Sequence, residues 1–201
     1  LGVDMITSGQ GIDRAIAERL QSASLTGVTL SIDGLGAVHD RLRGVEGSFD
    51  QALGAITVLD EAGLKVGVST QVNKLTLESL DVLGDAIEEA GAMGWQLQLT
   101  MPIGRGEDLE DLLLAPEDMP EVFRVVRKLV RRPRLRPYLT DNIGYLSKDD
   151  PLLRTPPMVP PRIWMGCFAG LRLVAVTSDG GIKPCLSLPD EFIEGNIRDR
   201  S

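Results

Sequence analysis

Hydrophobic positions follow two different periods through the first half of the chain. Four segments rich in apolar and β-branched residues are expected to be strands, at 2–6, 27–32, 65–72 and 95–101. Apolar residues recur every three or four positions in 12–23 and in the stretches that follow Ser48 and Thr76, which predicts helices. Strand–helix units repeated in this order predict right-handed crossovers and therefore a parallel sheet.

Cap residues mark the ends of two of these helices. Ser48 and Thr76 are expected at their N-caps, and Gly63 and Gly91 are expected to close them in the left-handed conformation. In the strands VGVSTQV and WQLQLT, apolar and polar residues alternate. One face of the sheet is therefore expected to line something polar, which favours a barrel or a curved sheet with a wet interior.

The second half of the chain is organised differently. A helix is predicted over 116–132, because a proline and acidic residues stand at its start and Arg and Lys at its end. The proline-rich stretch 133–161 is expected to be a linker without regular structure. The run LRLVAVTSDGGIKPCLSL then predicts a β-hairpin that turns at Asp179-Gly180-Gly181. The predicted layout is a domain over 1–132, the linker, and a small domain over 162–201.

Composition and charge exclude several classes of protein. The 201-residue chain carries a net charge of −8, whereas a general nucleic-acid surface needs a basic excess. It has no apolar run long enough to span a bilayer, and two cysteines are too few for a secreted disulfide framework. A cytoplasmic protein with no nucleic-acid or membrane partner is expected. The basic run 124–136 is expected to be the solvated face of an amphipathic helix, with an acidic partner as the alternative.

Polar residues gather where the predicted strands end. The segment 33–47 is expected to be a long loop, and with the end of the preceding strand it holds Ser31, Asp33, His39, Asp40, Arg41 and Arg43. Carboxyl ends of parallel strands share one rim, where such folds bind ligands. The forked guanidinium groups of Arg43 and Arg105 could clamp a carboxylate or phosphate there. Ordinary solvated loops are the alternative, and His39 beside Asp40 is either a general base or part of a loop-ordering pair.

The two cysteines lie on either side of the predicted hairpin. Cys167 and Cys185 are 18 residues apart. They could be ligands of an iron–sulfur cluster, which needs about four such ligands. Two buried free thiols, or a disulfide under oxidising conditions, are the alternatives.

Several motifs taken in order resemble a known family. SIDG, HDRLRG, GSF and TQVN, followed by GCFAG, IKPC and EGNIRDRS, resemble the radical S-adenosylmethionine (radical SAM) enzymes that carry a SPASM auxiliary iron–sulfur domain. The resemblance covers nearly the whole chain. It implies an α/β fold, with an incomplete (β/α) barrel of parallel strands and outer helices, followed by a small β-hairpin module of the SPASM or twitch type.

The resemblance also implies cofactors and the residues that hold them. S-adenosylmethionine is expected at the rim, with Ser31 and Arg43 on its methionyl part and Asp33 as a further cofactor-binding residue. Leu99 and Met101, just before the PIGRG turn, are expected on its adenosyl part. Cys167 and Cys185 are expected among the ligands of an auxiliary 4Fe-4S cluster. No catalytic residue is assigned.

The implied activity belongs to the complete enzyme. Such enzymes cleave S-adenosylmethionine to a 5′-deoxyadenosyl radical, which abstracts hydrogen from a peptide or protein substrate, and they take electrons from a donor such as a flavodoxin or ferredoxin. The cysteine triad that holds their catalytic cluster has no counterpart here. Leu186 stands where some relatives have an aspartate that acts as a base. A fragment cut at both ends and inactive by itself is therefore expected. The alternative is a non-catalytic α/β module that holds a small anion or peptide carboxylate at Arg43 and Arg105.

Overall fold

The computed structural model describes residues 2–103, 110–140, 143, 149–154 and 166–199. The chain forms two compact units. The first comprises Leu1–Thr100 and Asp111–Trp164, and the second comprises Met101–Glu110 and Met165–Ser201. The predicted domain boundaries at 132 and 162 remain predictions.

The first unit is built on a parallel sheet of five strands. Their bounds are β1 Asp4–Thr7, β2 Gly27–Ser31, β3 Val66–Val72, β4 Gly94–Leu99 and β5 Arg136–Leu139. The strands follow one another across the sheet in chain order, and every neighbouring pair is parallel. The carboxyl ends of the strands therefore lie at one rim, as predicted.

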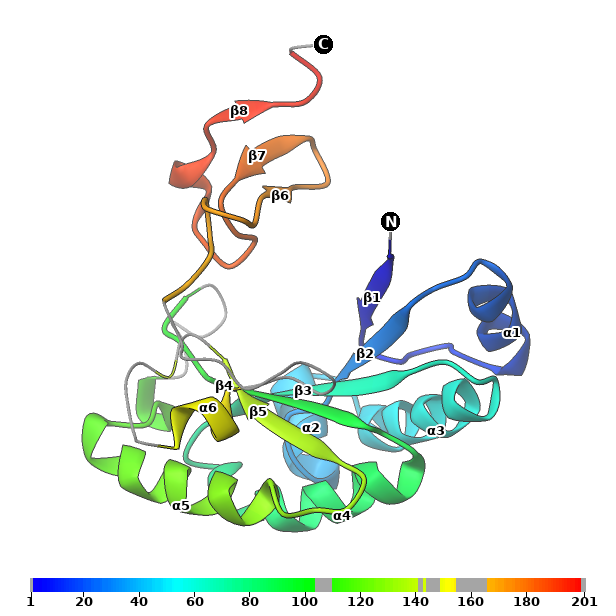
Figure 1. Cartoon of the computed structure of the whole chain (residues 1–201), viewed down its shortest axis with the longest axis vertical. Helices are drawn as coiled ribbons and strands as arrows, with labels where there is room; N and C mark the ends of the chain where they lie inside the picture. Colours follow the sequence, from blue (N-terminus) through cyan, green and yellow to red (C-terminus); the bar gives the residue numbers. More distant parts are fainter. Residues whose placement is uncertain (1, 104–109, 141–142, 144–148, 155–165, 200–201) are drawn as a thin grey trace. The chain divides into compact units, whose positions relative to one another are not determined.

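Helices connect the strands and cover one face of the sheet. Their bounds are α1 Arg14–Ser22, α2 Gly36–Arg43, α3 Ser48–Glu61, α4 Leu80–Ala90, α5 Met119–Leu129 and α6 Asp150–Leu153, with 3-10 turns η1 Leu77–Ser79 and η3 Pro116–Asp118. Figure 1 shows α2, α3, α4 and α5 on the same side of β2 to β5. Parallel strands with helices outside form the incomplete (β/α) barrel that the resemblance implied.

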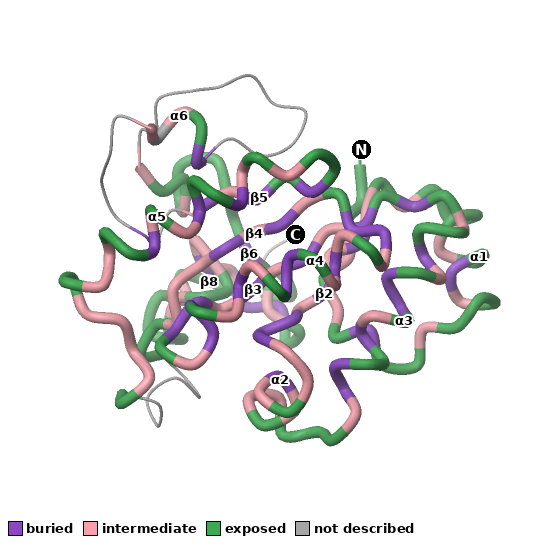
Figure 2. The backbone as a smooth tube through the Cα atoms, turned by 90° about the horizontal axis from the view of Figure 1, so that it is seen from below, coloured by how far each residue is buried: buried purple, intermediate pink, exposed green. Residues whose placement is uncertain are grey.

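The face of the sheet that meets the helices forms the hydrophobic core. The alternate residues Val28 and Leu30 of β2 and Trp95 and Leu97 of β4 are buried there, and Figure 2 shows buried segments along these strands. The indole N–H of Trp95 donates to Thr70 Oγ1 at 2.8 Å, and that hydroxyl donates to the Ile32 carbonyl at 2.6 Å. The buried polar atoms of this group are therefore paired with one another.

The opposite face of the sheet is polar and half-buried. It carries Thr29, Ser31, Ser69, Gln71, Gln96, Gln98 and Tyr138, which alternate with the core residues. The strand register places Ser31, Ser69, Gln96 and Tyr138 in one row across four strands. The alternation of VGVSTQV and WQLQLT therefore predicted the polar face correctly.

Two segments that were expected to be irregular contain regular structure. Helix α2 occupies most of the predicted loop 33–47, so His39, Asp40 and Arg43 lie on a helix. A helix of eight residues offers too few apolar repeats to stand out in a polar sequence. The stretch 133–161 is not simply a linker, because it contributes β5 and α6. Proline at 137 is compatible with a strand because β5 lies at the edge of the sheet.

The predicted helix ends are partly correct. Gly63 and Gly91 have φ angles of 80° and 115°, the left-handed conformation expected at these positions. Ser48 is the first residue of α3, and Gly47 takes the N-cap position instead. Thr76 is the N-cap of the 3-10 turn η1, which precedes α4.

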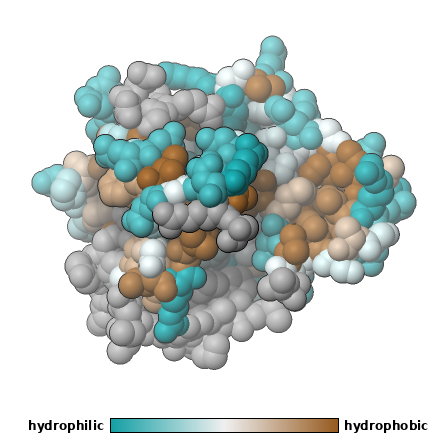
Figure 3. All heavy atoms as spheres, turned by 90° about the horizontal axis from the view of Figure 1, so that it is seen from above, coloured by the Kyte–Doolittle hydropathy of each residue, from teal (hydrophilic) through white to brown (hydrophobic). Residues whose placement is uncertain are grey.

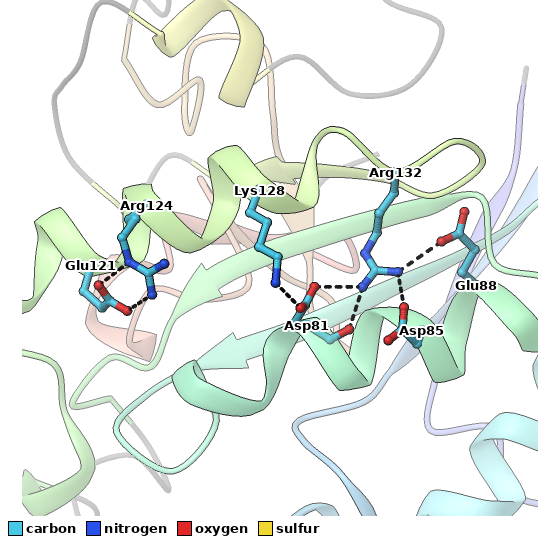
Figure 4. Close-up of polar contacts among 7 residues, drawn as sticks. All are labelled: Asp81, Asp85, Glu88, Glu121, Arg124, Lys128 and Arg132. Carbon is cyan, nitrogen blue, oxygen red and sulfur yellow. Dashed lines mark hydrogen bonds and ion pairs between the residues drawn. The ribbon is translucent and has the colours of Figure 1, made fainter.

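Ion pairs around Arg132 join α4 to the segment that follows α5 (Figure 4). Its guanidinium lies 2.7 Å from Asp85 Oδ1, 3.2 Å from Glu88 Oε2 and 3.1 Å from Asp81 Oδ1. A Cβ atom on Gly84 would lie only 2.9 Å from the Arg132 guanidinium carbon, so the glycine makes room for it. This part of the predicted basic run is therefore largely occupied by partners within the chain.

The second unit contains the predicted β-hairpin. Strands β6 Ala175–Val176 and β7 Gly181–Lys183 are antiparallel, and β8 Gly195–Asn196 pairs with the other side of β7. A 3-10 turn, η5 Asp190–Phe192, lies between β7 and β8. Asn196 donates to the Asp179 carbonyl at 3.1 Å, and a Cβ on Gly180 would lie 2.6 Å from the Asn196 side-chain oxygen. Asn196, from the EGNIRDRS motif, therefore stabilises the hairpin turn.

Apolar side chains are exposed on β1 and just before it, at one edge of the described sheet. Val3 is 58% exposed and Ile6 is 75% exposed. Figure 3 shows an apolar area at the side of the first unit that carries β1 and α1. Unpaired strand edges with exposed apolar residues favour association with other chains. Among the described residues, no helix has the length and apolar character needed to cross a bilayer.

Candidate functional site

The predicted rim residues Asp33 and Arg43 form an ion pair. Asp33 lies just beyond the end of β2, and Arg43 is the last residue of α2. Arg43 Nη2 lies 2.6 Å from Asp33 Oδ2, and the two side chains are 25% and 9% exposed. The other Asp33 oxygen accepts the backbone N–H of Gln71 at 2.8 Å, at the end of β3. Asp33 therefore ties together the ends of two neighbouring strands and the end of α2.

Ser31 lies on the same strand end but faces the polar side of the sheet. Its partner in register on β3 is Ser69. Its side chain is half-buried and has no hydrogen-bond partner within the described part of the chain. A hydroxyl in this position can donate to a ligand that rests on the polar face.

His39 organises the same loop from α2. It is 1% exposed, and its Nδ1 accepts the backbone N–H of Asp33 at 2.9 Å. Its ring centroid lies 6.0 Å from that of Phe49, in a tilted arrangement. Burial lowers the pKa of His39 despite the nearby Asp33 carboxylate, which acts in the opposite direction. The imidazole is therefore neutral in the folded protein at neutral pH.

Asp40 orders a different part of the segment. Its Oδ1 accepts the backbone N–H of Phe49 at 2.9 Å and its Oδ2 accepts that of Gly47 at 2.7 Å, at the start of α3. The Phe49 N–H is the main cause that lowers the pKa of Asp40, and the Gly47 N–H adds to it. His39 and Asp40 therefore both order the backbone, through separate bonds rather than as a pair with each other.

The remaining predicted cofactor contacts lie further along the chain. Leu99 ends β4 and packs against the hydrophobic core. Met101 is 44% exposed and belongs to the second unit. Arg105, predicted beside Arg43 at the rim, lies outside the described residues. These three assignments remain predictions.

The polar row on the sheet contains residues that were not singled out from the sequence. The Tyr138 hydroxyl donates to Gln96 Oε1 at 3.1 Å, and burial raises the pKa of Tyr138. Ser69 lies between Gln96 and Ser31 in the row. The alternation of β3 and β4 indicated a polar face, but β5 lay in the stretch expected to be a linker. Its contribution of Tyr138 was therefore not predicted.

Each cysteine has a backbone donor directed at its sulfur. The N–H of Ala169 lies 3.5 Å from Cys167 Sγ, and the N–H of Ser187 lies 3.5 Å from Cys185 Sγ. The two segments are adjacent, because a Cβ on Gly170 would lie 3.5 Å from Pro184 Cβ. Both cysteines are free thiols, not a disulfide. Backbone donors of this kind stabilise thiolates and tune the properties of iron–sulfur clusters in proteins that hold them.

These two thiols do not complete a metal site. No group of three or more candidate metal ligands occurs among the residues that the structure describes. A four-iron cluster needs about four protein ligands. The assignment of Cys167 and Cys185 as ligands of such a cluster therefore stays a prediction.

Comparisons with known proteins identify relatives along the whole chain. It is 26% identical to the AdoMet-dependent heme synthase of Methanosarcina barkeri, over 100% of this chain and 58% of that protein. It is 27% identical to the mycofactocin maturase MftC of Mycolicibacterium smegmatis, over 98% of this chain and 48% of that protein. The chain is related to the radical SAM enzymes of the SPASM type. It spans about half the length of these curated relatives.

The fold agrees with this relationship. Streptococcus suis SuiB bound to its precursor peptide SuiA superposes with a TM-score of 0.67 at 16% identity, over 98% of this chain and 46% of SuiB. SuiB bound to S-adenosylmethionine gives a TM-score of 0.66 at 17% identity, over 91% of this chain and 42% of SuiB. No protein-family model matches the chain.

Proposed function

We propose that this chain is the part of a radical SAM/SPASM enzyme that holds S-adenosylmethionine and supplies ligands to an auxiliary 4Fe-4S cluster. The observation that carries the proposal is the position of Arg43, which is held at the carboxyl ends of β2 and β3 by Asp33. The relationship to SuiB and the maturases supports the same reading. The complete enzyme is an oxidoreductase or maturase.

Ser31 and Arg43 suit the amino-acid end of the cofactor. A guanidinium offers five N–H donors in a fork that matches a carboxylate, and the Asp33 pair uses only part of them. The Ser31 hydroxyl adds a neutral donor on the polar face. Leu99 and Met101 are proposed for the adenosyl part. The bound cofactor, cleaved with a catalytic 4Fe-4S cluster, supplies a 5′-deoxyadenosyl radical that abstracts hydrogen from the substrate.

We infer a peptide or protein substrate. The row Ser69, Gln96 and Tyr138 presents neutral hydrogen-bonding groups, which suit amide groups of a peptide. Substrates with several carboxylates would instead call for cationic partners. SuiB binds a precursor peptide and MftC is a maturase, which supports this class. Electrons would come from a flavodoxin or ferredoxin in the cytoplasm.

The cysteine segments suit the auxiliary cluster. Cys167 and Cys185 would provide two thiolates, each with its backbone N–H donor already in place. The catalytic cluster needs cysteines that this sequence does not contain. The 201 residues alone are therefore proposed to bind the cofactor without cleaving it.

Calorimetry of S-adenosylmethionine binding tests the proposal. The wild-type chain is expected to bind, and Arg43→Ala is expected to weaken binding at least tenfold, because a charge-assisted bond to the cofactor carboxylate is worth about 1.5–3 kcal/mol. Arg41→Ala, on the same helix, is the control and should bind normally. No binding by the wild-type chain would favour the alternative of a non-catalytic module that holds a small anion at Arg43 and Arg105.

A further inference from the structure

Asp33 has little capacity left for a ligand. One carboxylate oxygen is paired with Arg43 at 2.6 Å and the other accepts the Gln71 N–H at 2.8 Å. The residue is only 6% exposed. A carboxylate with both oxygens engaged inside the protein acts on its protein partners rather than on a cofactor, and an acidic group would also repel the cofactor carboxylate.

His39 fixes the backbone from which Asp33 projects. Its Nδ1 accepts the Asp33 N–H, so the ring carries its proton on Nε2. The position of Asp33 is therefore set from both sides, by His39 on α2 and by the Gln71 N–H at the end of β3. Because His39 and Arg43 are four residues apart on α2, they lie on one face of that helix.

Arg43 retains donors that the protein leaves unused. Its Nε is buried and has no hydrogen-bond partner within the described part of the chain. Buried donors without partners are rare in folded proteins and often occur at functional sites. The guanidinium is thus held in one place by Asp33, while at least its Nε–H donor remains without a partner within the described part of the chain.

We propose that Asp33 and His39 are positioning residues, which hold the Arg43 guanidinium in the orientation that receives the cofactor carboxylate. This inference rests on the proposed S-adenosylmethionine site. Asp33 acts through its ion pair with Arg43, and His39 acts through the backbone N–H of Asp33. An arginine side chain has large rotamer freedom, so fixing it before binding removes an entropic cost from the binding step.

Three variants of the 201-residue chain separate these roles. Asp33→Asn keeps an acceptor for the Gln71 N–H but removes the charge that holds Arg43. His39→Leu removes the acceptor for the Asp33 N–H, whereas His39→Asn places an amide oxygen close to the position of Nδ1. Asp33→Asn and His39→Leu are expected to weaken S-adenosylmethionine binding roughly three- to tenfold in calorimetry. His39→Asn is expected to restore affinity to within about twofold of wild type.

Stability and affinity must be measured on the same samples. Each variant is checked by urea unfolding, and affinity is compared only where the chain is folded. A loss of affinity in His39→Leu that His39→Asn rescues at equal folded fraction supports positioning, since a purely structural role would change stability alone.

Two outcomes would overturn the inference. Wild-type affinity in folded Asp33→Asn shows that Arg43 needs no positioning partner, while the proposed cofactor site stands. Complete loss of binding in folded Asp33→Asn, equal to that of Arg43→Ala, makes Asp33 a direct contact instead. A wild-type chain that binds no S-adenosylmethionine contradicts the proposed function itself, and this role falls with it.

Discussion

At the scale of single residues, three side chains of the HDRLRG motif make three different contacts. His39 accepts from Asp33, Asp40 caps the start of α3, and Arg43 pairs with Asp33. The sequence indicated a rim and an arginine directed at a carboxylate. It did not indicate that Arg43 would also pair with a carboxylate of the chain itself, that of Asp33. This pairing depends on α2, which turns Arg43 back toward the end of β2.

Protonation of His39 is expected to destabilise the protein. Its pKa in the folded state is lowered from 6.5, mainly by burial, so the unfolded chain binds a proton more readily. Stability contributed by neutral His39 is therefore full above about pH 6.5 and is lost as the pH falls below that value. Because His39 is the single histidine, urea midpoints at pH 8 and pH 5.5 report on it directly.

His39→Asn provides the control for this pH dependence. It keeps an acceptor for the Asp33 N–H but cannot be protonated in this range. Between pH 8 and pH 5.5 its urea midpoint should change less than that of the wild type. An equal decrease in both proteins would assign the pH dependence to the carboxylates instead.

At the scale of helices and strands, periodicity predicted more than local composition did. The alternation in β3 and β4 correctly indicated a core face and a polar face. Prolines in 133–161 pointed to a linker, but β5 forms there because tertiary pairing with β4 outweighs the weak local signal. The helix predicted over 116–132 is present as η3 and α5 but ends at Leu129, and Arg132, which follows it, pairs with α4.

Arg132, three residues beyond the end of α5, is expected to contribute more to stability than a surface arginine on α5. Its side chain is 12% exposed and meets Asp81, Asp85 and Glu88, which would repel one another without it. Arg132→Met is therefore expected to lower the free energy of unfolding by about 1–3 kcal/mol. Arg124 is 66% exposed and pairs with Glu121, so Arg124→Met should cost less than about 1 kcal/mol. Equal losses in urea unfolding would contradict the distinction.

At the scale of the whole molecule, the two units divide the proposed chemistry. Ser31 and Arg43 belong to the first unit, and both cysteines belong to the second. The sequence predicted an α/β domain, a linker and a hairpin domain that carries both cysteines, and the boundaries at 132 and 162 stay predictions. It could not predict the row that includes Tyr138, since that row arises only when four strands align in register.

Thermal unfolding with and without S-adenosylmethionine tests whether the cofactor binds mainly to the first unit. A ligand that binds only the folded form stabilises it by RT ln(1 + [L]/Kd), or about 2.7 kcal/mol at a hundredfold excess over Kd. Trp95 is fully buried in the first unit, so its fluorescence reports the unfolding of that unit, in a Trp164→Phe background that leaves it the sole tryptophan. Reaction of the half-buried Cys185 with a thiol reagent reports on the second unit, whereas Cys167 is already exposed in the folded chain. S-adenosylmethionine is expected to raise the Trp95 midpoint by several degrees and to change the temperature dependence of the thiol reaction less, because Met101 is the one proposed contact that belongs to the second unit.

Arg43→Ala serves as the control in the same experiment. Its Trp95 midpoint should not respond to the ligand, because the guanidinium that receives the cofactor carboxylate is gone. A ligand-induced shift that appears equally in the Trp95 and thiol signals would mean that the cofactor stabilises both units together. In that case the contacts on the first unit alone would not account for binding, and Met101, which belongs to the second unit, would become the next residue to substitute.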